Sequence, residues 1–93
     1  MRFHAILKME NRMYTSSVYY GEELIKEYNR PISQEDIETI LRTEMLYRDL
    51  DRAEMLFSID FSQKYDSRVF VMDFDEKLFT SYSIEEYENI KNR

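Results

Sequence analysis

The sequence predicts a small α+β fold, because segments with strand periodicity and segments with helical periodicity occur in the same short chain. Residues 55–61 alternate between apolar and polar side chains, which is typical of a strand with one buried face. A second apolar run, 68–75, follows the turn-like segment 64–67, so the two runs are expected to pair as an antiparallel hairpin. Residues 33–50 instead repeat their apolar side chains at helical spacing.

Two strands and a short helix are expected before the long helix. Residues 3–9 alternate, and 13–20 are rich in β-branched and aromatic residues, with Asn11–Arg12 as the turn between them. Segment 22–28 begins with two acidic residues and has its apolar residues on one face, which indicates a helix of about two turns. Pro31 is expected to end it, because proline disfavours helical geometry in the residue before it.

The long helix and the C-terminal helix each carry a start signal. Ser33 has the properties of an N-cap, and the helix after it is expected to run to about Leu50. Ser83 and Glu86 match a capping box, which predicts a helix that closes the domain. The segment 77–82 between the hairpin and this helix is compatible with a short strand or with an irregular link.

The predicted order of elements is therefore β-β-α-α-β-β-α over one domain, residues 1–93. The simplest arrangement is a mainly antiparallel four-stranded sheet with the helices packed on one face.

The residue inventory argues against most enzyme classes. The 93 residues include no cysteine, one histidine and one glycine, so thiol chemistry, cysteine-based zinc sites and glycine-rich phosphate loops are not expected. His4 lies on the polar side of the first strand, where a solvent-facing side chain is expected. No apolar stretch approaches the roughly 20 residues of a membrane span. We expect a non-enzymatic cytoplasmic protein without a cofactor.

Acidic residues outnumber basic ones, and the excess lies in the middle of the chain. The net charge is −6, and residues 33–66 hold nine acidic and four basic residues. Such a chain is not expected to bind nucleic acid directly, because phosphate binding depends on lysine and arginine. The carboxylates could instead form one face that occupies a basic surface of a partner, or they could be separate solvated charges paired with arginine and lysine. The candidates for the acidic face are Glu35, Asp36, Glu38, Asp49, Asp51, Glu54, Asp60, Asp66, Asp73, Asp75 and Glu76.

Aromatic residues are numerous for so small a domain. Eight tyrosines and six phenylalanines are more than one small core is expected to hold, so some rings should reach the surface and contact a partner. The alternative is that they line the rim of the core. Two valines of the second hairpin strand should face away from the helices, where they need a covering segment or another chain. The candidates are Tyr14, Tyr19, Tyr20, Tyr47, Tyr65, Tyr82, Val69 and Val71.

Asp73 and Asp75 form the one motif with the look of a metal site. An apolar strand delivers two carboxylates two residues apart, and hard divalent cations prefer such ligands. The more common explanation of this pattern is a strand that ends in a turn, and we favour it, so no metal ligand is assigned.

The acidic, compact and glycine-poor composition is similar to that of small phage or mobile-element proteins that inhibit host nucleic-acid machinery, including mimics of DNA. This resemblance implies a protein-binding inhibitor that blocks a basic, nucleic-acid-handling surface of a host protein. The first alternative is a structural or regulatory homodimer that assembles through its sheet, and the second is a module that binds a divalent metal at Asp73 and Asp75.

Overall fold

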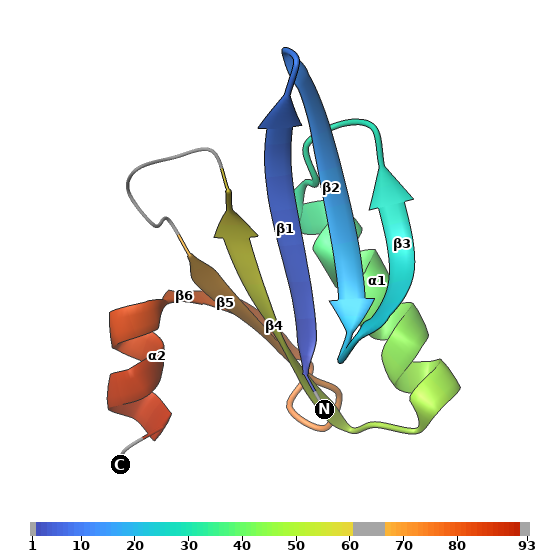
Figure 1. Cartoon of the computed structure of the whole chain (residues 1–93). Coiled ribbons are helices and arrows are strands. Elements are labelled where there is room, and N and C mark those ends of the chain that lie inside the picture. The colour runs from blue at the N-terminus through green and yellow to red at the C-terminus, as the bar shows by residue number, and fades with distance from the viewer. Residues whose placement is uncertain (1, 61–66, 92–93) are drawn as a thin grey trace.

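The computed structural model describes residues 2–60 and 67–91, which form six strands and two helices (Figure 1). In chain order the elements are β1 (Phe3–Glu10), β2 (Met13–Tyr20), β3 (Glu23–Tyr28), α1 (Gln34–Arg48), β4 (Arg52–Ile59), β5 (Arg68–Asp73), β6 (Leu78–Ser83) and α2 (Ile84–Lys91). A β-β-β-α unit therefore occurs twice along the chain.

The strands form one mixed sheet with the order β3-β2-β1-β4-β5-β6. The central strands β1 and β4 are parallel, with Phe3 opposite Met55, and the other neighbours are antiparallel. The prediction of a four-stranded, mainly antiparallel sheet in the order β-β-α-α-β-β-α was wrong. Parallel neighbours need a long crossover, and here the chain passes through β2, β3 and α1 before it returns beside β1.

The short helix predicted over 22–28 is the edge strand β3. Gly21 has a positive φ of 60°, which lets the chain turn back tightly after β2, and its N–H donates to the Arg2 carbonyl beside β1 at 2.9 Å. The register of β2 and β3 shifts between Val18 and Tyr19, which marks a bulge or irregularity. The segment 77–82, for which a short strand or an irregular link was expected, lies almost entirely in the second edge strand, β6, which runs to Ser83.

The start of α1 agrees with the sequence. Ser33 is the N-cap, and its hydroxyl accepts the N–H of Asp36 at 3.1 Å. The Asp36 carboxylate in turn accepts the N–H of Ser33 at 2.8 Å, which completes a capping box. The helix ends at Arg48, two residues before the predicted end at about Leu50, because Asp49 takes a left-handed conformation with φ 56°.

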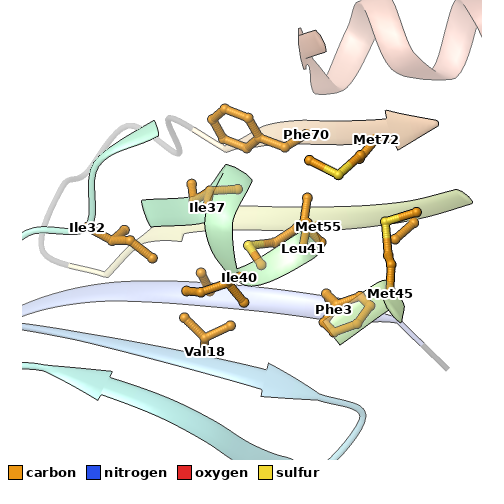
Figure 2. Packing of buried hydrophobic residues seen from close by; sticks show 12 residues of the cluster. Phe3, Val18, Ile32, Ile37, Ile40, Leu41, Met45, Met55, Phe70 and Met72 are labelled. Atoms are coloured by element: carbon orange, nitrogen blue, oxygen red, sulfur yellow. The ribbon is translucent and has the colours of Figure 1, made fainter. Parts of the chain in front are cut away.

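The core lies between α1 and one face of the sheet (Figure 2). Ile37, Leu41 and Met45 of α1 are almost fully buried, and their spacing places them on one side of the helix. The sheet contributes side chains from β1, β2, β4 and β5 to the same cluster, namely Phe3, Ala5, Val18, Ala53, Met55, Phe70 and Met72.

The prediction that the helices pack on one face of the sheet was also wrong. The two helices lie on opposite faces. Phe70 and Met72 of β5 belong to the same core cluster as the buried residues of α1 (Figure 2), so the alternation of the strand directs Val69 to the other face. Val69 is 2% exposed, and α2 contacts β5 and β6. The start of α2 confirms the predicted capping box, since the hydroxyl of Ser83 accepts the Glu86 N–H and the Glu86 carboxylate accepts the Ser83 N–H, both at 3.1 Å. Within 2–60 and 67–91, no helix is long and apolar enough to cross a membrane.

Candidate functional site

Five carboxylates are brought to one end of the sheet by the topology. The starts of β4 and β6 and the end of β5 meet at this end, because Arg52 lies opposite Asp73 and Asp73 lies opposite Leu78. The link from α1 to β4 and the turn from β5 to β6 are also here (Figure 1). We call this region the acidic end, defined by the carboxylates of Asp49, Asp51, Asp73, Asp75 and Glu76.

Backbone hydrogen bonds hold the two halves of the acidic end together. The Phe74 N–H donates to the Asp51 carbonyl at 3.0 Å, which joins the β5–β6 turn to the α1–β4 link. In that link, the Leu50 N–H donates to the Met45 carbonyl at 2.8 Å. The chain is therefore fixed where the side chains of Asp49 and Asp51 leave it, and both residues are exposed.

Asp73 is a turn-forming residue in this structure. One of its carboxylate oxygens, Oδ1, accepts the N–H groups of Asp75 at 3.0 Å and of Glu76 at 3.2 Å. Lys77 completes the turn with a φ of 55°, and its N–H donates to the Phe74 carbonyl at 3.3 Å. Among the described residues, no group of three histidine or acidic side chains is arranged to hold a metal ion.

Two large side chains in the last turn of α1 are exposed. Leu46 is 72% exposed and Tyr47 is 82% exposed, three and two residues before the C-cap Asp49. They lie outside the buried stripe of α1, which ends at Met45. Tyr47 was a predicted contact residue, whereas Leu46 was not. Its position next to a stripe residue, rather than three or four residues from one, was the signal that it faces outward.

The other predicted acidic residues lie elsewhere or are paired. Asp36 accepts two hydrogen bonds from the Arg30 guanidinium, at 2.6 and 3.0 Å, and these lower the pKa of its carboxyl well below the usual value. Glu38 pairs with Arg42 at 2.7 Å, one turn further along α1, and Glu35 is exposed in the first turn.

Asp60 lies at the opposite end of the sheet from the acidic end. It follows β4, and its N–H donates to the Leu7 carbonyl at 2.8 Å. Its carboxylate is 3.9 Å from the Lys8 ammonium. Asp66 and Tyr65 lie outside the described residues. The predicted set of carboxylates therefore does not form a single face.

Glu54 lies near the acidic end but is engaged by three neighbours. Its Oε1 is 2.9 Å from an Arg52 guanidinium nitrogen, and its Oε2 is 3.9 Å from Arg2. Its Oε2 also accepts a hydrogen bond from the Tyr87 hydroxyl. Burial, and then this contact with Glu54, raise the pKa of Tyr87. Glu54 is thus available to a partner only in competition with these groups.

The remaining candidate tyrosines are more buried than Tyr47 or lie at the far end. Tyr20 is half-buried, with the Phe3 ring on one side and the Arg48 guanidinium 4.0 Å from its ring centre. Tyr82 is half-buried near the Tyr87 ring of α2. Tyr14 is 39% exposed near the β1–β2 turn.

Tyr19 stacks on His4 at a ring distance of 4.8 Å, on the face of the sheet opposite α1. His4, expected to be solvent-facing, is half-buried as a result. Of the two candidate valines, Val71 is half-buried, whereas Val69 is buried on the face of the sheet where α2 contacts β5 and β6.

Comparisons with protein-family models, with curated proteins and with solved structures found no significant match to this chain.

Proposed function

We propose that this protein is a non-enzymatic, cytoplasmic protein-binding module that uses the acidic end, with Leu46 and Tyr47, to occupy a basic surface of another protein. One observation carries the proposal. Four exposed carboxylates, those of Asp49, Asp51, Asp75 and Glu76, lie at the same end as two exposed large side chains and have no ion-pair partner among the described residues.

The combination suits an interface better than either part alone. An exposed tyrosine and leucine offer apolar area to a partner, and tyrosine is enriched among residues that dominate binding energy. Unpaired carboxylates at the same end of the sheet need not give up an internal ion pair when a cation approaches. They also speed the encounter with a basic surface, an effect that salt weakens.

The partner class follows from the charge. A basic protein surface large enough to face several carboxylates is typical of proteins that handle nucleic acid. We therefore propose an inhibitor of such a protein, of the kind that phages and mobile elements produce. The compositional resemblance supports this source, and the clustering of acidic side chains at one end supports the mode of binding.

Affinity capture tests the proposal. The tagged protein is used as bait in lysate of the source cell or its host, and bound proteins are eluted with steps of rising salt. We expect a stoichiometric nucleic-acid-handling protein that elutes as salt rises. A captured partner whose release does not depend on salt would count against binding through the acidic end.

A homodimer is the second proposal, favoured by the part of the sheet that α2 leaves open. Ile6 on β1 and Leu56 on β4 are half-buried on the face opposite α1 and line a shallow pocket of about 250 Å³. Sedimentation of the purified protein tests it. A dimer that Ile6→Lys or Val71→Lys converts to monomer would support self-assembly, and a monomeric wild-type protein would exclude it.

A further inference from the structure

A pocket between the starts of β1 and β4 carries a local excess of positive charge in this acidic protein. It has a volume of about 340 Å³ and is lined by Arg2, Phe3, Tyr20, Leu50, Arg52 and Glu54. Pockets that bind small ligands begin at roughly 300 Å³, so this one has room for a small organic molecule.

The charge excess comes from two guanidinium groups that share one carboxylate. Arg52 makes a close ion pair with Glu54, at 2.9 Å, whereas the Arg2 guanidinium is 3.9 Å from it, beyond hydrogen-bond distance. Glu54 also accepts the hydrogen bond from Tyr87. Since two positive groups face one negative group, one positive charge is left over, and the side chains of Arg2 and Arg52 are 50% and 55% exposed.

Arg48, the third arginine near the pocket, is already paired with carboxylates. Arg48, whose guanidinium lies over the Tyr20 ring, pairs with Glu44 at 3.0 Å and with Glu23 at 3.4 Å. Arg48 therefore adds no unpaired charge. Asp49 and Asp51 belong to the acidic end nearby and oppose the approach of an anion at long range, so we expect weak binding.

We propose that Arg2 and Arg52 together bind the phosphate or carboxylate group of a small organic anion in this pocket. Guanidinium groups form paired hydrogen bonds with the oxygens of both anions. The apolar part of the ligand would lie against the side chains of Leu50 and Tyr20. The strand starts position the two arginines, since β1 and β4 are adjacent and parallel. The proposal stands apart from the proposed function, because it requires no protein partner.

Titration with phenyl phosphate, followed by backbone amide NMR, tests the proposal, with uncharged phenol as the control ligand. We expect saturable shifts of the amides of Phe3, Tyr20 and Ala53, with a Kd on the order of 1 mM, and none with phenol. A parallel titration with benzoate shows whether a carboxylate is accepted as well. Shifts with phenyl phosphate that do not saturate, or that fall elsewhere on the protein, would overturn the proposal.

Two sets of variants separate the pocket from general charge effects. The double change Arg2→Gln and Arg52→Gln should weaken binding roughly tenfold or more. The matched change Arg42→Gln and Arg68→Gln alters the net charge equally, away from the pocket, and should leave the Kd within about twofold. Equal weakening by both pairs would contradict the proposal.

Glu54→Gln provides a test in the opposite direction. The amide keeps an acceptor for the Tyr87 hydroxyl but removes the carboxylate that competes for the two guanidinium groups. We expect phenyl phosphate to bind several-fold more tightly to this variant, on the order of threefold to tenfold. A purely structural role of the arginines would give no such gain, and weaker binding would overturn the proposal.

Discussion

The hydroxyl of Tyr87 on α2 donates a hydrogen bond to the carboxylate of Glu54 on β4, so the last helix is tied to a central strand of the sheet. β5 lies between β4 and β6, and the Tyr87 side chain therefore reaches across one strand. The ring is 8% exposed. This contact helps to hold a helix of eight residues on the face opposite α1.

Removal of the Tyr87 hydroxyl should destabilise the fold. Tyr87→Phe leaves the ring in place but removes a hydrogen bond to a carboxylate, so the free energy of unfolding should fall by about 1–2 kcal/mol. Urea denaturation measures this difference. Tyr82→Phe is the matched control, because Tyr82 is a half-buried neighbour on the same face. This variant should lose less than about 0.5 kcal/mol of unfolding free energy. Equal losses would show that the hydrogen bond to Glu54 adds nothing.

Asp36 should make stability depend on pH in the acidic range. Hydrogen bonds from Arg30, and then from Ser33, lower the pKa of this carboxyl from its ordinary 3.8. Its contribution is therefore complete above that ordinary value and is lost as the pH falls through the lowered one. We expect Asp36→Asn to destabilise the protein at pH 7, and the difference from wild type to shrink as the pH falls below about 4. Chemical denaturation at several pH values measures it.

Glu35→Gln is the control for that experiment, since Glu35 lies in the same first turn without an ion pair among the described residues. A difference between wild type and Asp36→Asn that stays constant from neutral to strongly acidic pH would contradict this role of Asp36.

Truncation of two leucines of α1 should have very different effects on the stability of the fold. Leu41 is fully buried, so Leu41→Ala should lower the free energy of unfolding by about 2–5 kcal/mol. Leu46 is 72% exposed, so Leu46→Ala should change the free energy of unfolding by less than about 0.5 kcal/mol. The same change should weaken capture of the proposed partner. Thermal or urea denaturation measures the change in stability of both variants. Similar stability losses in both variants would mean that Leu46 is packed rather than exposed.

The β1–β2 turn offers a stabilising substitution. Asn11 and Arg12 both have a positive φ, 50° and 65°, between the paired residues Glu10 and Met13. This is the pattern of a type I′ turn, in which Asn-Gly is preferred. Arg12→Gly should therefore raise the free energy of unfolding by about 0.5–1 kcal/mol. Asn11→Ala should lower it, and a stability loss with Arg12→Gly would contradict the turn geometry.

Local signals in the sequence predicted the elements that carry them. The N-cap Ser33, the capping box of Ser83 and Glu86, and the strand Met13–Tyr20 all lie where periodicity and capping chemistry placed them. These features depend on interactions between residues close in the chain. The hairpin of β4 and β5 also forms as expected, because a short connection favours antiparallel neighbours.

The misassigned segment shows where local signals fail. Leu24, Ile25 and Tyr28 share one face of a helix, but they lie in β3, where the register shift opposite Val18 and Tyr19 disturbs the alternation of a regular strand. Ile25 and Tyr28 pack on the core while Leu24 is 50% exposed. Without knowledge of the shift, this pattern favours a helix.

The acidic end could not be predicted because it depends on contacts distant in the sequence. Asp51 and Asp75 come together only because the β5–β6 turn bonds to the α1–β4 link. The same is true of the arginine pocket, in which Arg2 and Arg52 meet through the parallel pairing of β1 and β4. Local signals predict hairpins between successive strands, but they do not show that β1 and β4, which are separated by β2, β3 and α1, are neighbours.

The most direct test of the proposed function is the capture experiment repeated with two charge-reversed baits. One bait carries Asp51→Lys, Asp75→Lys and Glu76→Lys at the acidic end, and the other carries Glu10→Lys, Glu85→Lys and Glu88→Lys, an equal change at exposed positions elsewhere. We expect wild type and the second bait to retain the same nucleic-acid-handling protein and the first bait to lose it. Retention by the first bait, or equal loss from both, would contradict binding through the acidic end.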